Sequence, residues 1–303
     1  LADYGTVEYF NVSVFTTGIF RTWHGLGDLT TAAQLSAMLL LAVLVLMSLE
    51  TASRRQLRYH NPSIKPAAKR LPLGKGMAIF CCVVVSIPFC IGFLIPASRL
   101  LFLAIQDGFS YFDMDFLGLI WNSFYIAACS AGLCLSLALM LVYSKRLLPD
   151  GSSSTTLRLA ISGYAIPGTV IAIGILIMLS YIDQSTNIFL SGGIFALLFA
   201  YAVRFLAISV QTLESGLEQI RFSIDESSQI LGARFLTRAK SIHFPLLRDS
   251  IITACLLVFV DVLKELPATL ILRPFNFNTL AVKTFELAGD ERLSEASLPA
   301  LTI

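Results

Sequence analysis

The feature that most constrains this chain is a series of long segments without a charged side chain. A run of about 20 apolar residues crosses the hydrocarbon core of a bilayer as a helix, and a buried soluble core would need shorter, amphipathic segments. Only 14% of the residues are charged, whereas soluble domains usually carry about 25%. The uncharged runs are 29–49, 76–98, 116–144 and 159–182.

Two further apolar runs carry a few charges. Residues 184–213 contain Arg204, and residues 250–272 contain Asp261, Lys264 and Glu265. Together the six runs predict an all-α protein, a polytopic transmembrane helical bundle.

The basic content of the intervening segments predicts which side of the membrane each one faces. Segments 50–75, 145–158 and 214–249 together hold fifteen Lys and Arg, and the segments on the opposite side hold five. Basic residues collect on the cytoplasmic side, so we expect a multi-pass membrane protein with these three segments in the cytoplasm. The basic run in 50–75 is interpreted as a topological anchor, with contact to anionic membrane lipid as the alternative.

A weak internal repeat indicates two similar membrane halves. Phe10-Asn11 matches Phe275-Asn276, and Gly27-Asp28 matches Gly289-Asp290, in the same order along the chain. Inverted or parallel repeats of this kind are common in transporters. We expect residues 1–49 to be the end of a truncated first repeat, 50–75 a cytoplasmic linker, and 76–303 a second repeat whose last span is incomplete.

The most informative segment is the cytoplasmic loop 214–249. Gly232 supplies the backbone freedom for a turn between two short helices, of which residues 217–231 are expected to form the first. Pro245 is expected to end the second helix and start the next span. The positions of this loop whose spacing is informative are Asp225, Glu226, Ser227, Ser228, Gly232, Ile242 and Pro245.

This spacing resembles the loop of binding-protein-dependent ABC importer permeases, which reads Glu-Ala-Ala, three residues, Gly, nine residues, Ile-x-Leu-Pro. Here Ser227 and Ser228 replace the two alanines, and Phe244 replaces Leu. The resemblance implies that the seven positions form an ATPase-coupling loop, which docks in a cleft of ABC ATPase subunits. The alternative is a generic amphipathic loop at the membrane interface.

Longer stretches resemble the fused, two-repeat permeases of ferric-iron importers. They are residues 163–168, 261–269 and 273–281, together with the segment that begins at Leu1. The resemblance implies the type I ABC importer permease fold and transport of ferric iron delivered by a periplasmic or lipid-anchored substrate-binding protein. It implies no cofactor, no metal site of the chain's own and no nucleic-acid partner.

The charges in the sixth run are candidates for a substrate pathway. A charge at the centre of a span costs roughly 2.5–3.5 kcal/mol on insertion scales, so it faces a water-filled path or pairs with another charge. Asp261 and Lys264 are three residues apart and can pair, while Asp261 and Glu265 would share an acidic helix face suited to a cation. Glu265 mirrors Asp3 in the other half, and structural pairing is the alternative.

The sequence offers no catalytic machinery. Gly74-Lys75-Gly76 lacks the upstream glycine and the following Ser or Thr of a phosphate-binding loop. The chain is therefore expected to be a transport subunit and not an enzyme, with ATP hydrolysis supplied by a separate ATPase subunit. The rival functions are an ABC permease for thiamine, phosphonate or another small solute, and an ion-coupled secondary transporter, which would leave the loop spacing unexplained.

Overall fold

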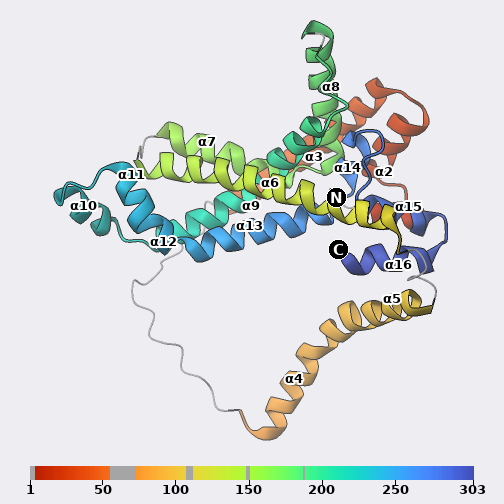
Figure 1. Cartoon of the computed structure of the whole chain (residues 1–303), viewed down its shortest axis with the longest axis horizontal. Helices are drawn as coiled ribbons and strands as arrows, with labels where there is room; N and C mark the ends of the chain where they lie inside the picture. Colours follow the sequence, from red (N-terminus) through yellow and green to blue (C-terminus); the bar gives the residue numbers. More distant parts are fainter. Residues whose placement is uncertain (1–3, 55–72, 107–111, 148–150, 187) are drawn as a thin grey trace.

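The computed structural model describes residues 4–54, 73–106, 112–147, 151–186 and 188–303, and every regular element within them is a helix (Figure 1). The predicted all-α fold class is therefore confirmed. Most of the expected linker 50–75 lies outside the described residues.

Within the described residues, five helical stretches are long and apolar enough to cross a membrane. They lie in α3 (Leu29–Arg54), in the continuous stretch Lys75–Gln106, in α6 (Met114–Leu147), in α8 (Gly168–Thr186) and in α9 (Ile194–Glu218). The prediction of a polytopic membrane bundle is confirmed by these helices.

The centre of the bundle is formed by α6, α9 and α13 (Arg248–Leu263), which pack side by side (Figure 1). Their contact surfaces are rich in small side chains, because close approach of backbones drives helix association where lipid removes the hydrophobic effect. Fully buried small residues include Ala127, Ala131 and Ala138 of α6, and Ala196 and Ala200 of α9.

Two of the predicted runs are not single helices. The run 159–182 is interrupted after α7 (Gly151–Ser162) by a 3-10 turn, Gly163–Ala165, and α8 begins at Gly168 directly after Pro167. The run 250–272 is interrupted between α13 and α14 (Pro267–Leu272). In both places a proline removes a backbone donor and prevents the helix from continuing.

The positions matched by the internal repeat share an unusual backbone conformation. Asn11 has φ 52° and Asn276 has φ 64°, and asparagine tolerates this left-handed region better than most residues. The preceding side chains, Phe10 and Phe275, are both exposed. Asn11 follows α1 (Gly5–Tyr9) and precedes α2 (Phe15–Phe20) and the π-helical turn Arg21–Gly25, while Asn276 follows α14 and precedes α15 (Leu280–Gly289) and α16 (Leu293–Thr302).

The second membrane stretch stands apart from the central bundle. It comprises α4 (Lys75–Phe89), a π-helical turn, Cys90–Leu94, and α5 (Ile95–Gln106), which packs against α16 (Figure 1). None of the residues of α4 is buried in the chain. In a bilayer, its apolar side chains contact lipid or another polypeptide.

Candidate functional site

The loop 214–249 forms an elbow at one end of the long axis, and α14–α16 lie at the other end (Figure 1). Its first helix is α10 (Phe222–Ile230), which is shorter than the expected 217–231. The reason is that α9 continues through Glu218, and the chain turns at 219–221 with Arg221 in an extended conformation, so residues 217 and 218 belong to the membrane helix.

Gly232 lies at the turn after α10, where the sequence places it. Its φ is +77°, a conformation that only glycine adopts without strain. The amide of Gly232 donates to the carbonyl of Gln229, and the amide of Ala233 donates to the carbonyl of Ser228. These bonds satisfy carbonyl groups at the end of the helix and reverse the chain.

The chain returns to the membrane through three short helical pieces. They are α11 (Phe235–Arg238), the π-helical turn Ala239–His243, and α12 (Phe244–Leu246), which has Pro245 in its first turn. The central helix α13 follows after Leu247. Ile242 is half-buried and Pro245 is exposed.

The two sides of α10 have different environments. Asp225 and Ser228 face inward and are buried, whereas Glu226 and Ser227 face solvent. At the tip, Ile230 is 87% exposed and Leu231 is 86% exposed. The surface available to a partner therefore includes Glu226, Ser227 and the two aliphatic tip residues, and Asp225 and Ser228 are not part of it.

Asp225 fixes the elbow to the membrane helices. Its Oδ2 accepts from Nε of Arg146, at the end of α6, over 2.8 Å, and its Oδ1 lies 2.7 Å from Nε2 of His243. Nη1 of Arg146 donates to the carbonyl of Leu217 over 2.7 Å, and Nη2 donates to the carbonyl of Ile220 over 3.1 Å. One buried cluster thus joins α6, the end of α9, α10 and the return segment.

The electrostatics of Asp225 favour its charged form. Burial by itself would raise the pKa of Asp225, but the hydrogen bond and charge of Arg146, together with His243, hold the pKa below its ordinary value. The pKa of Asp225 is therefore lower in the folded state than in the unfolded state. Its pairing with Arg146 and His243 stabilises the fold at pH values above the unfolded-state pKa, and this stabilisation disappears as the pH falls through the folded-state pKa.

Sequence reasoning missed both partners of Asp225. Arg146 counts in the sequence as a topological charge, and it lies 79 residues before Asp225. His243 lies within the loop, but its spacing carries no signal of a bond to Asp225. The aliphatic tip was also missed, although two consecutive aliphatic residues before a turn glycine, in a loop assigned to water, are a signal that could have found it.

A second cluster surrounds Glu265 in the break between α13 and α14. Its carboxylate lies 3.3 Å from Nη1 of Arg204 on α9 and accepts from the amide of Ala268 over 3.3 Å. The hydroxyl of Thr269 donates to the carbonyl of Glu265 over 2.6 Å, and it lies 2.6 Å from the hydroxyl of Tyr201. A buried carboxylate in a span is thereby compensated by a cation and by the N-terminus of α14.

The shared acidic face proposed for Asp261 and Glu265 is wrong, because α13 ends at Leu263 and Glu265 turns toward α9. Asp261 instead pairs with Lys264 over 2.7 Å, as their spacing allows. Both charges of that pair are thus locally compensated. Asp3, the matching position in the other half, lies outside the described residues.

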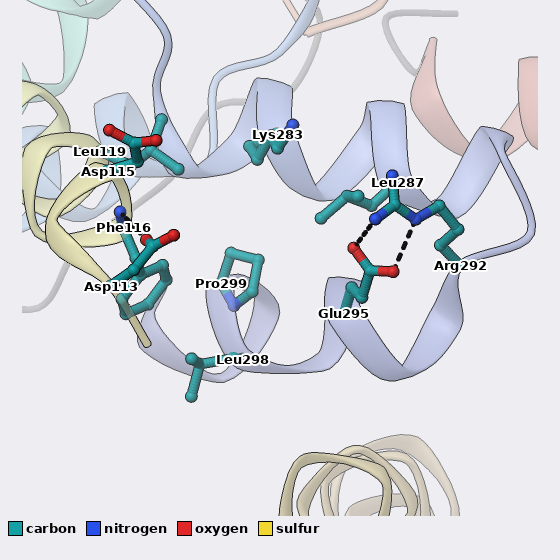
Figure 2. Close-up of a pocket in the computed structure, with 10 residues that line it drawn as sticks. All are labelled: Asp113, Asp115, Phe116, Leu119, Lys283, Leu287, Arg292, Glu295, Leu298 and Pro299. Atoms are coloured by element: carbon teal, nitrogen blue, oxygen red, sulfur yellow. Dashed lines mark hydrogen bonds and ion pairs between the residues drawn. The ribbon is translucent and has the colours of Figure 1, made fainter. Parts of the chain in front are cut away.

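A pocket of about 250 Å³ opens at the opposite end from the elbow, between the start of α6 and helices α15 and α16 (Figure 2). Asp113, Asp115 and Lys283 line it, and the ion pair of Arg292 with Glu295 closes one side. It contains none of the residues predicted for the substrate pathway. Among the described residues, no group of three His, Cys, Asp or Glu is placed to hold a metal ion.

Comparison with known proteins identifies relatives that are transport permeases. The whole chain aligns at 28% identity with the Fe(3+)-transport system permease protein FbpB 2 of Haemophilus influenzae, and spans 60% of the length of that protein. Over 73% of the chain, it is 27% identical to 86% of PhnV from Salmonella paratyphi A, whose name gives it as a permease protein of a 2-aminoethylphosphonate transport system. No family model matches the chain. The resemblance to importer permeases inferred from the sequence is confirmed by these relatives, which are transport subunits and not enzymes.

Gly168 is predicted not to tolerate a larger residue. A Cβ there would overlap the guanidinium of Arg204 and lie 2.6 Å from Oε1 of Glu265. We expect Gly168→Ala to destabilise the purified protein by about 2–3 kcal/mol, because it pushes a buried ion pair apart. Gly174→Ala in the same helix is the matched control, since a Cβ there meets no atom, and it should be neutral or stabilising. Equal thermal unfolding temperatures for the two variants would contradict this account.

Substitution of Asp225 is predicted to lower the stability of the protein, whereas substitution of its exposed neighbour Glu226 is not. Asp225→Ala leaves Arg146 buried without its carboxylate, and we expect a loss of about 2–3 kcal/mol. Glu226→Ala changes an exposed side chain and should alter stability by less than about 0.5 kcal/mol. The check is thermal unfolding of both variants in the same detergent; a loss in Glu226→Ala as large as in Asp225→Ala would refute the assignment of the two faces.

Proposed function

We propose that the chain is most of the membrane-spanning permease subunit of an ATP-driven ABC importer in the bacterial inner membrane. The observation that carries this proposal is the elbow: a short helix whose inner side is tied to the bundle by Asp225 and whose tip presents Ile230 and Leu231 to solvent. The names of the relatives, permease proteins of transport systems, agree with it.

The elbow has the properties of a docking element for ATPase subunits. Burying an aliphatic side chain of this size in a partner's cleft contributes about 1.5–3 kcal/mol, and two such residues side by side form an apolar anchor. Glu226 beside them adds a charge that selects a basic partner surface. In this proposal ATP hydrolysis belongs to the partner.

The arrangement also suggests how movement at the elbow reaches the membrane. The return segment leads directly into α13, and α13 ends at the break where Glu265 contacts Arg204 of α9. Displacement of α10 by an ATPase therefore acts on α6 through Arg146 and on α13 through His243. Rocking of one half of the permease against the other would follow, with residues 1–49 belonging to the first repeat and 76–303 to the second.

Ferric iron is our first candidate for the transported solute, delivered by a periplasmic or lipid-anchored binding protein. The basis is the similarity over the whole chain to a Fe(3+)-transport permease. A small organophosphonate is the second candidate, because the PhnV relatives are named for 2-aminoethylphosphonate transport.

The coupling role predicts loss of the ATPase when the tip becomes polar. The double variant Ile230→Ser, Leu231→Ser should weaken ATPase binding by about 100-fold or more, since two apolar contacts of about 1.5 kcal/mol or more each are removed. Phe275→Ser, which removes an exposed aromatic residue from the opposite end of the molecule, is the control and should bind normally. Affinity is measured with the purified full-length permease and the ATPase; normal binding by the double variant would overturn the proposal.

The solute is tested by uptake into cells that lack the chromosomal gene. Cells complemented with the full-length protein should accumulate radioactive ferric iron, and cells carrying Gly232→Val should not, because a β-branched residue is strained at a φ of +77°. Uptake of 2-aminoethylphosphonate instead of iron would select the second candidate. Unimpaired uptake by the Gly232→Val variant would argue against ATPase coupling through the elbow.

A further inference from the structure

A buried arginine near the elbow has no counter-charge among the residues that the structure describes. Arg238, at the end of α11, is only 8% exposed, and its Nε has no hydrogen-bond partner. No carboxylate of the described residues lies within ion-pair distance of it. An isolated buried charge costs several kcal/mol unless it is paired, so an anion bound to this guanidinium would stabilise the folded protein.

Arg238 lines a cavity of about 120 Å³ between the end of α6, α10 and the return segment. Tyr143, Arg146, Asp225, Gln229 and His243 also line it, and Nδ1 of the buried His243 has no hydrogen-bond partner. The cavity has room for several water molecules or for one tetrahedral oxyanion. It thus combines a buried, unpaired cation with further polar groups.

The other buried charges of the cavity are already paired. Both oxygens of Asp225 have partners, Arg146 on one side and His243 on the other. The guanidinium of Arg146 also donates to two carbonyl groups and lies 4.8 Å from the centre of the Phe222 ring. Glu226 is at the rim and exposed, and its carboxylate forms no ion pair within the described part of the chain. Among the described residues, Arg238 is therefore the buried charge of the cavity that lacks a partner.

We propose that this cavity is a binding site for a phosphate-type oxyanion, held by the guanidinium of Arg238. The planar fork of a guanidinium matches two oxygens of a tetrahedral phosphate and makes short charge-assisted hydrogen bonds to them. The side-chain amide of Gln229 lines the same cavity and can donate a further hydrogen bond to the anion. The phosphate has two possible sources, free inorganic phosphate or the headgroup of an anionic lipid, because the cavity adjoins the end of a membrane helix.

The site would tie the moving parts of the elbow together. Its walls come from α10 on one side and from the return segment on the other, so a bound anion adds a second link between the two limbs beside the contact of Asp225 with His243. The inference stands on the cavity and on Arg238, and does not require the transport function.

The test measures thermal unfolding of the full-length protein in nanodiscs by tryptophan fluorescence. Inorganic phosphate is titrated at constant ionic strength, with chloride as the replaced anion, in discs of phosphatidylcholine and in discs that also contain phosphatidylglycerol. A ligand that binds the folded state raises the unfolding temperature with its concentration. We expect stabilisation by phosphate, by phosphatidylglycerol, or by both in competition, and the arm that responds identifies the source.

Variants at two nearby basic positions make the test specific. Arg238→Gln should weaken the apparent affinity at least about tenfold, since it removes the charge-assisted bonds, whereas Arg238→Lys should retain part of the response. Lys240→Gln, which removes an exposed charge two residues away, should respond like the unchanged protein. The proposal is overturned if neither phosphate nor anionic lipid stabilises the protein, if Arg238→Gln responds as strongly as Lys240→Gln, or if only addition of the ATPase gives an Arg238-dependent stabilisation. If Arg238→Gln does not fold, the titrations of the unchanged protein still decide the question. Absence of stabilisation by both phosphate and anionic lipid overturns the proposal.

Discussion

The compensation of buried charge is the constraint on which this structure depends. A bilayer supplies no water to an ion in a span, so a charge there needs a partner from another helix or a helix terminus. Glu265 obtains both, from Arg204 on α9 and from the amide of Ala268 at the start of α14. The same requirement operates at the elbow, where Asp225 is held between Arg146 and His243.

These two clusters lie just beyond the two ends of α13, the helix at the centre of the bundle. At one end the return segment leads from His243 into α13, and at the other the chain breaks beside Glu265. Between them, small residues allow α6 and α9 to pack closely. Ionic contacts beyond both ends of α13 thus add to the packing that holds this helix between α6 and α9.

The sequence predicts the spans well, because an uncharged run of sufficient length has one stable solution in a bilayer. It does not predict which runs are interrupted, since Pro88 lies inside the continuous helical stretch Lys75–Gln106 without breaking it, while Pro167 and Pro267 each mark the start of a new helix. The loop spacing located the elbow and its turn at Gly232, but not the side of α10 that faces outward. Asp225 and Glu226 look equivalent in a sequence, and what separates them is Arg146, a residue brought near only by the folding of α6 against α9.

The exposed tip of the elbow has a consequence for how such a protein is made. Two neighbouring aliphatic side chains, Ile230 and Leu231, stand almost wholly in water at the end of a short helix, and such patches invite association with whatever apolar surface is nearby. Until another surface covers it, this end of the molecule remains adhesive from the moment the chain is synthesised.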